Sequence, residues 1–106
     1  MKSPYLRMLQ ALKAQKKPSR SGKRDKWFLY ILECSDGKFY TGITKDIVRR
    51  LKAHNSGKGA TFTRVRRPVK IIYQETLKGR AQALIREFAV KALPRKKKEA
   101  LVASRD

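Results

Sequence analysis

A chain of 106 residues is long enough for one domain and a tail. Its 28 lysines and arginines against 8 acidic residues give a net charge of +20, so we expect a polyanionic partner, either nucleic acid or an anionic membrane surface. No apolar run reaches the length of a membrane span, and the single cysteine, Cys34, excludes an intramolecular disulfide and a cysteine-rich zinc site.

Residues 1–26 form a basic leader with nine lysines and arginines and one acid. They carry too few apolar residues to fold alone, so we predict that residues 14–26 are flexible. Residues 3–13 can form a short helix, with an apolar stripe of Tyr5, Leu9 and Leu12. This composition is typical of a basic tail that binds phosphate groups. An organelle transit peptide has a similar composition.

The folded domain is expected over residues 27–106 and begins with a β-hairpin. The runs WFLYILEC (27–34) and KFYTGI (38–43) are apolar and aromatic, and an aspartate-glycine turn separates them. The turn decides where two tyrosines point. A two-residue loop would place Tyr30 and Tyr40 on opposite faces of the sheet.

A three-residue loop, with Gly37 in the left-handed conformation, places both tyrosines on one face and sets Tyr30 opposite Gly42. Gly42 has no side chain and leaves space beside the Tyr30 ring. We favour this register because it also builds a core layer on the other face, from Leu29, Ile31, Phe39 and Ile43. Tyrosines are common in strands for packing reasons alone, so this spacing does not by itself establish a site.

A helix is predicted from about Ile47 to Asn55, with Asp46 as its N-cap and Gly57 as its stop. Arg50 and His54 lie at the edge of its buried stripe, which we assign to Ile47, Val48 and Leu51. His54 is the only histidine, and a lone histidine beside a core is more often hydrogen-bonded filler than a catalyst. It cannot build a zinc site without further histidines.

A basic loop (57–68) leads to a third strand, VKIIYQE (69–75), and Gly79 opens a helix over 80–93. Pro94 ends this helix and can start a last one through about Ala103. The order ββαβαα predicts an α+β fold, a three-stranded antiparallel sheet flanked by helices. The buried stripe of the helix at 80–93 is assigned to Ala81, Leu84, Ile85, Phe88 and Ala92.

Glu87 lies at the border of that stripe and is the only acid of its segment. It can form an ordinary ion pair with Lys91, four residues on. A carboxylate kept amid so much positive charge can also hold a divalent cation, because Mg²⁺ binds through one or two carboxylates, waters and substrate phosphate.

Together these residues resemble the GIY-YIG nuclease superfamily, above all its small single-domain bacterial members, over about residues 27–103. The resemblance rests on Tyr30, on YTG at 40–42, on Arg50 eight residues later, on His54-Asn55 and on Glu87. It implies a divalent-metal-dependent DNA endonuclease that uses Mg²⁺ or Mn²⁺ to hydrolyse phosphodiester bonds.

The resemblance also assigns roles. Tyr30 is expected to act as a general base or to position water, and Tyr40 to orient the water or the scissile phosphate. Arg50 would stabilise charge on the phosphate, and Glu87 would be the single metal-binding glutamate. His54 matches a histidine often present on the same helix. Cations around Tyr30 are expected to depress its pKa.

The chain departs from the family pattern at several positions. The first motif reads Phe28-Leu29-Tyr30, without the glycine and isoleucine, and Thr41 replaces an isoleucine in the second. Thr61-Phe62 and Val65 stand where small members show lysine-tyrosine and glycine. These changes bear on loop conformation and substrate grip more than on the chemistry.

We expect the basic loop to bind the DNA backbone through Lys58, Arg64, Arg66 and Arg67. A second basic run at 95–98 is expected to add to this binding. Both basic segments could instead be ordinary solvent-exposed surface, which is the usual meaning of a run of charged residues. Without a zinc knuckle or helix-turn-helix, we expect recognition of branched, flapped or single-stranded DNA by shape, in DNA repair or processing, by a cytoplasmic, nucleoid-associated protein. Two other functions stay open: a non-catalytic nucleic-acid-binding module on the same fold, and a basic accessory protein of ribosomes or membranes.

Overall fold

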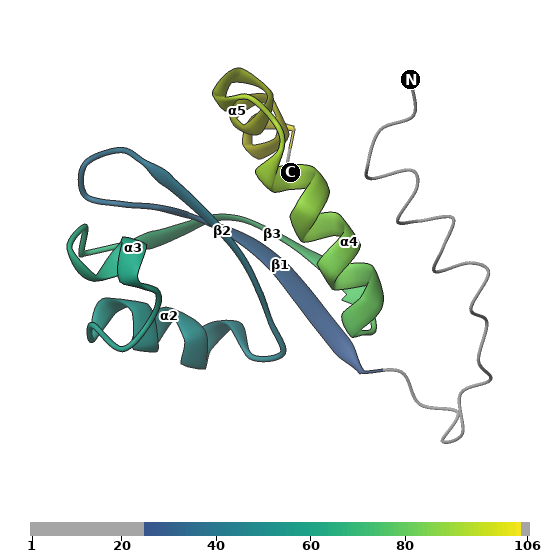
Figure 1. Ribbon diagram of the computed structural model, residues 1–106, viewed down its shortest axis with the longest axis horizontal. Coiled ribbons are helices and arrows are strands. Elements are labelled where there is room, and N and C mark those ends of the chain that lie inside the picture. The colour runs from purple at the N-terminus through teal and green to yellow at the C-terminus, as the bar shows by residue number, and fades with distance from the viewer. Residues whose placement is uncertain (1–24, 105–106) are drawn as a thin grey trace.

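The structure of the protein, a computed structural model, describes residues 25–104 (Figure 1). The predicted helix at 3–13 lies outside the described residues, as does nearly all of the flexible segment predicted at 14–26. No helix formed by residues 25–104 is long and apolar enough to cross a membrane.

Three antiparallel strands form one sheet in the order β2-β1-β3. Their bounds are Lys26–Glu33 for β1, Phe39–Thr44 for β2 and Lys70–Lys78 for β3. The central strand β1 is apolar on both faces, with Leu29 to Leu32 all buried, because helices cover both sides of the sheet. The predicted α+β fold with a three-stranded antiparallel sheet is confirmed.

The hairpin between β1 and β2 has the three-residue loop predicted from the sequence. The amide of Cys34 donates to the carbonyl of Lys38 (2.8 Å), and Gly37 has a φ of 84°. Tyr30 therefore pairs with Gly42, and Leu32 with Tyr40. Alternation along both strands then places the two tyrosines on the same face of the sheet.

Helices lie on the two sides of the sheet (Figure 1). On one side are α2 (Ile47–Asn55) and the four-residue α3 (Thr61–Arg64). On the other are α4 (Arg80–Lys91) and α5 (Arg95–Ala103). One core, built on Leu29, Ile31, Tyr73 and Val90, lies on the face that also packs against Leu101 and Val102 of α5. The second, built on Tyr30, Leu32, Cys34 and Val69, packs against Ile47 and Leu51 of α2.

The helix bounds follow the sequence signals closely. Asp46 caps α2 by accepting a hydrogen bond from the amide of Arg49 (3.1 Å), and the left-handed Gly57 follows its end. Pro94 is the N-cap of α5 rather than its first residue. Helix α3 is an addition to the predicted order, because the segment expected to be a loop contains one short helical turn.

The predicted buried stripes were partly wrong. On α2, Val48 is 64% exposed while His54 is fully buried, so this helix turns its Arg50 and His54 side towards the sheet. On α4 the buried residues are Ala83, Ile85 and Val90. Of its predicted stripe, only Ile85 is buried. Arg86 explains this rotation, because it faces inward to bind Glu75 on β3 (2.7 Å) and leaves Leu84 and Phe88 at the surface.

Candidate active site

The two phenols of β1 and β2 meet beside α2. Their ring centroids are 6.5 Å apart, and the rings are tilted by 40°. The space over Gly42 is filled by the Tyr30 ring, because a Cβ built on that glycine would lie 2.5 Å from the Tyr30 hydroxyl. Gly42 therefore positions the phenol by lacking a side chain. Tyr30 is 2% exposed, whereas Tyr40 is half-buried.

His54 joins the pair from the buried side of α2. Its Nε2 lies 3.0 Å from the Tyr30 hydroxyl. Its ring packs edge-on against both phenols, with centroid distances of 5.9 Å to Tyr30 and 5.2 Å to Tyr40. Gly59 makes this arrangement possible, since a Cβ there would collide with the His54 ring and its Cα. His54 is thus a fully buried group with both ring nitrogens engaged.

The hydrogen-bond pattern assigns the His54 tautomer. The Thr63 hydroxyl donates its single proton to the carbonyl of Ala60 (2.9 Å). With that proton on Ala60, the hydroxyl accepts from Nδ1 of His54, 2.8 Å away. Nδ1 carries the proton, Nε2 is the acceptor, and the Tyr30 hydroxyl donates to it. Burial, and secondarily the positive charge of Arg50, lower the pKa of His54, which keeps the imidazole neutral at pH 7.

Arg50 lies half-buried at the same site, and its guanidinium interacts with both phenols. Burial raises the pKa of the Tyr30 phenol, and the neighbouring Arg50 only partly opposes that rise. The expected depression of the Tyr30 pKa also invoked a bound metal, and the protein groups alone raise this pKa instead. Desolvation outweighs the nearby cation, so Tyr30 keeps its proton at neutral pH.

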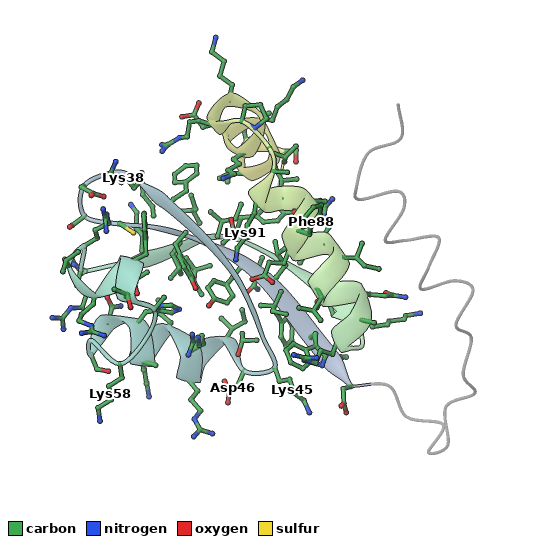
Figure 2. The ribbon with its side chains drawn as sticks, viewed as in Figure 1. Lys38, Lys45, Asp46, Lys58, Phe88 and Lys91 are labelled. Atoms are coloured by element: carbon green, nitrogen blue, oxygen red, sulfur yellow. The ribbon has the colours of Figure 1, made fainter. Side chains whose placement is uncertain are left out.

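Glu87 approaches the site from α4. Its side chain is 19% exposed and pairs with Lys91 at 3.1 Å, in the i, i+4 geometry that the sequence allows. Its negative charge is among the causes that raise the Tyr30 pKa, although it is the smallest of them. Lys91, labelled on α4 in Figure 2, is 52% exposed, and such a surface pair contributes little to stability.

The profile of a family described as the GIY-YIG catalytic domain matches residues 26–100. The chain belongs to the GIY-YIG family. The match spans the whole sheet and both helices that carry the candidate residues. The GIY-YIG domain marks a nuclease family, which implies DNA as the class of substrate.

Similar proteins include small bacterial members of this family. A UPF0213 protein of Desulfotalea psychrophila is 51% identical over 80 residues, which make up 74% of this chain and 73% of that protein. A UPF0213 protein of Staphylococcus saprophyticus is 46% identical over 79 residues, which make up 74% of this chain and 96% of that protein.

Two solution NMR structures resemble the fold. One is a UPF0213 protein of Bacillus halodurans, with 45% identity, a TM-score of 0.51 and coverage of 76% of this chain and 85% of that one. The other is a protein of E. faecalis, with 40% identity, a TM-score of 0.54 and coverage of 77% and 88%. The GIY-YIG architecture of this chain is therefore found in solved relatives.

In the described part of this GIY-YIG domain, a divalent cation could be held by a single carboxylate, but not by a cluster of protein ligands. Among residues 25–104, no three acidic, histidine or cysteine side chains gather. Glu75 is unavailable, because Arg86 and the Tyr73 hydroxyl (2.5 Å) hold it. A single carboxylate suits Mg²⁺ or Mn²⁺ when water and substrate phosphate complete the oxygen shell. Glu87 meets that requirement.

The four predicted DNA-binding residues divide into two classes. Arg66 binds Asp36 (3.1 Å) and Arg67 donates to the carbonyl of Arg64 (2.8 Å), so both guanidiniums hold the loop together. Lys58 and the Arg64 side chain are exposed and make no polar side-chain contact with the described residues. Of the four, these two have charged groups wholly free for phosphate.

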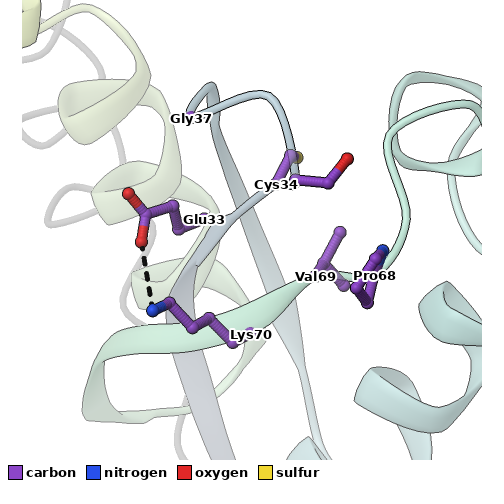
Figure 3. A pocket seen from close by; sticks show the side chains of 7 residues that line it. Glu33, Cys34, Gly37, Pro68, Val69 and Lys70 are labelled. Carbon is purple, nitrogen blue, oxygen red and sulfur yellow. Dashed lines mark ion pairs between the residues drawn. The ribbon is translucent and has the colours of Figure 1, made fainter.

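Two hollows near the sheet differ in character. One, of about 420 Å³, is lined by three cations, Lys45, Arg49 and Arg50, which suit a phosphate, and also by the acid Asp46. The other, of about 410 Å³, lies at the end of β1 (Figure 3). It holds the Glu33–Lys70 ion pair (3.5 Å) and the buried Cys34, whose thiol pKa is raised mainly by burial, so that it stays protonated.

Sequence reasoning missed Thr63, Lys45 and Arg49. Thr63 follows His54 by nine residues across a loop, and no periodic pattern links the two positions. Lys45 and Arg49 differ from the other basic residues only in lying beside Arg50, which depends on how α2 is rotated. Only the packed structure distinguishes them.

Proposed function

We propose that the protein is a divalent-metal-dependent DNA endonuclease that hydrolyses phosphodiester bonds and selects its substrates by DNA structure. The observation that carries the proposal is the Tyr30–His54 hydrogen bond (3.0 Å), in which the assigned tautomer makes the phenol the donor and Nε2 the acceptor. A buried phenol that already donates to a neutral base is suited to relaying a proton. Packing of the two rings alone would not require the phenol to be the donor in this hydrogen bond.

The proposed proton path starts at the attacking water. The Tyr30 oxygen takes a proton from the water while its own proton passes to Nε2 of His54, which becomes an imidazolium. The hydroxide forms a bond to phosphorus, the bond to the departing nucleotide oxygen breaks, and that oxygen takes a proton from solvent. His54 then returns its proton to solvent through Tyr30. This path needs no phenolate at rest, which agrees with the raised pKa of Tyr30.

Arg50 and Tyr40 would hold the phosphate. A guanidinium can donate two parallel hydrogen bonds to phosphate oxygens, and it stabilises the negative charge that grows during attack. A Mg²⁺ or Mn²⁺ ion held by Glu87 would supply further Lewis-acid stabilisation of that charge. When the phosphate arrives, Lys91 can leave Glu87 at small cost, because their ion pair is exposed on the lysine side.

The test is cleavage of a panel of branched, single-stranded and duplex DNAs with Mg²⁺ or Mn²⁺. We expect Glu87→Ala and Tyr30→Phe each to lower the cleavage rate by about a hundredfold or more, while DNA binding changes little. Two matched controls keep their rates. Glu33→Ala removes a carboxylate paired with Lys70, and Tyr73→Phe removes a buried hydroxyl that is bonded to Glu75.

A second candidate is a non-catalytic DNA-binding module. The Glu87–Lys91 ion pair favours it, because that pair gives Glu87 a structural partner without any metal. Binding without any Glu87-dependent cutting across the whole panel would establish this candidate and overturn the endonuclease. Full cleavage by Tyr30→Phe would leave the endonuclease standing but refute the proton path.

A further inference from the structure

A third hollow, of about 240 Å³, lies beside the start of β2. It is lined by Lys38 and Phe39 at the hairpin, by Phe62 of α3, and by Arg95 and Lys98 of α5. We call it the α3–α5 cleft. Because β2 is an edge strand, the cleft passes the open edge of the sheet and connects the side of α3 to the side of α5. The residues that line it come from three separate segments.

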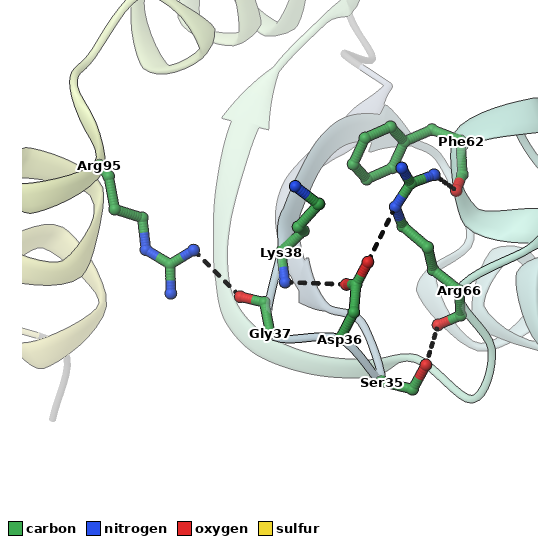
Figure 4. A network of polar contacts seen from close by, with 7 residues as sticks. All are labelled: Ser35, Asp36, Gly37, Lys38, Phe62, Arg66 and Arg95. Atoms are coloured by element: carbon green, nitrogen blue, oxygen red, sulfur yellow. Dashed lines mark hydrogen bonds and ion pairs between the residues drawn. The ribbon is translucent and has the colours of Figure 1, made fainter.

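Two arginines hold the aromatic rings that line the α3–α5 cleft, and one of them, Arg95, lines the cleft itself. Arg95 lies over the Phe39 ring at 3.6 Å and donates to the carbonyl of Gly37 (3.0 Å). Arg66 lies over the Phe62 ring at 4.0 Å and donates to the Phe62 carbonyl (2.8 Å). Figure 4 shows the hairpin tip between these two arginines. Their contacts fix both aromatic rings, so the cleft is already formed before any ligand arrives.

The lysines of the cleft are not engaged in this way. The ammonium groups of Lys38 and Lys98 make no hydrogen bond or ion pair with any described residue. The cleft therefore offers two free cations next to aromatic surface, with Phe62 36% exposed. Phosphate is the natural partner of the cations. Because Arg66 lies over the Phe62 ring and Tyr40 stacks on it, the exposed edge of Phe62 is what remains for the face of a nucleobase.

The α3–α5 cleft adjoins the candidate active site through one ring. The Phe62 ring also stacks on Tyr40, with centroids 6.0 Å apart and planes 26° apart. A strand whose scissile phosphate lies at Arg50 and Tyr40 would therefore place a neighbouring nucleotide beside Phe62. A paired base is stacked inside its duplex and offers no free face, so only an unpaired nucleotide could use this aromatic surface.

We propose that the α3–α5 cleft binds an unpaired nucleotide next to the scissile phosphate, so that the substrates of this protein carry a single-stranded segment at the cut. The inference rests on the proposed endonuclease function, and it specifies the class of DNA on which that site acts. Lys38 and Lys98 hold the backbone of that segment, and Phe62 contacts its base.

The test measures binding of the full chain to two DNAs without divalent metal, so that no cleavage occurs. One is a blunt duplex, and the other is the same duplex with a single-stranded overhang. We expect Phe62→Leu to weaken overhang binding by about tenfold, because one base–aromatic contact is lost, and to leave duplex binding within about twofold. Thermal unfolding checks that the variant folds.

A second variant removes the cations instead of the ring. We expect Lys38→Ala combined with Lys98→Ala to reduce the slope of log affinity against log salt by about one to two for the overhang DNA alone. The matched control is Lys52→Ala combined with Lys78→Ala, which removes two exposed lysines, one on α2 and one at the end of β3, that do not line the cleft.

Each outcome decides the matter. Equal losses on both DNAs, or equal losses in the control pair, would overturn the α3–α5 cleft as a site for an unpaired nucleotide. Selective loss of overhang binding supports it, even if no DNA is ever cut and the endonuclease proposal fails. Glu87-dependent cutting without any overhang-selective loss would refute the cleft alone.

Discussion

At the scale of single residues, the hydroxyl of Thr63 decides the chemistry available to His54. It accepts the Nδ1 proton because its own proton is committed to Ala60. That commitment leaves Nε2 as an acceptor for the Tyr30 phenol. A threonine with no direct contact to Tyr30 thus sets the direction of the buried hydrogen bond.

We predict that Thr63→Val lowers the cleavage rate by about tenfold or more, because the Nδ1 proton loses its acceptor and the other tautomer becomes competitive. Thr63→Ser retains the hydroxyl and should recover most of the rate. The measurement is the cleavage rate of both variants as a function of pH. Thr61→Val, an exposed threonine on the same short helix, serves as control. A rate unchanged in Thr63→Val would contradict a positioning role.

The buried His54 also predicts a pH dependence of stability. Its pKa in the folded protein is lowered below 6.5, so the unfolded chain binds the proton more readily. The stability that depends on neutral His54 is complete above pH 6.5 and is lost as the pH falls through the lowered value. Urea unfolding between pH 7.5 and 5.5 measures this loss.

The prediction is well isolated, because the chain has one histidine, and the pKa values of its neighbours Tyr30 and Arg50 are raised from ordinary values that already lie above that range. We expect the decline to be absent in His54→Gln, whatever that variant's overall stability. Parallel pH profiles for the two proteins would show that another group is responsible.

At the scale of elements, the β1–β2 turn determines whether a site can form. A three-residue loop brings Tyr30 and Tyr40 onto one face, and a two-residue loop would separate them. Gly37 makes the longer loop possible through its positive φ, and the turn is held by Arg66 on one side and Arg95 on the other (Figure 4). The turn residues were readable from the sequence, whereas both arginine contacts were not.

We predict that Gly37→Ala destabilises the protein by about 1–2 kcal/mol, the cost of a left-handed conformation for a residue with a Cβ. A Cβ at this position would meet no atom within 4 Å, so the cost is one of backbone conformation alone. Gly37→Asn should cost less, since asparagine tolerates that conformation. Denaturant unfolding of the three proteins gives the comparison, and equal stability of Gly37→Ala and the parent would contradict it.

The two helices that carry the site illustrate what periodicity can predict. Their bounds came within two residues of those predicted, because caps and stops are local signals. Their orientation was less predictable. Apolar periodicity favoured Val48 and Leu84 as buried, but polar contacts of His54 and Arg86 with the sheet turn these helices the other way. Buried polar bonds are not visible as a pattern in one sequence.

At the scale of the whole molecule, the net charge of +20 governs encounter with DNA more than it governs the fold. Several arginines are committed to internal contacts, including Arg66, Arg67 and Arg86. The cations left for phosphate include Lys58, Arg64, Lys38 and Lys98, which lie on the loop, the hairpin and α5. We expect these cations to contact the DNA backbone.

We predict that the affinity for any DNA falls steeply with salt, and that Lys58→Ala combined with Arg64→Ala lowers the log–log slope by about one to two. Arg67→Ala should instead mainly reduce stability, because its guanidinium donates to the carbonyls of Arg64 and Asn55. Fluorescence anisotropy at several salt concentrations gives the slopes, and thermal unfolding gives the stability. A salt-independent affinity would exclude phosphate-dominated binding.

The sequence by itself determined the order of the elements apart from the short α3, the hairpin register and the elements on which Tyr30, Tyr40, Arg50 and Glu87 lie, because turns, caps and strand alternation act over a few residues. The tertiary structure alone decided which faces the helices bury, that Thr63 orients His54, and that Phe62 links Tyr40 to the α3–α5 cleft. These relations join segments far apart in the chain. They depend on how buried polar groups find partners, and no local pattern encodes that.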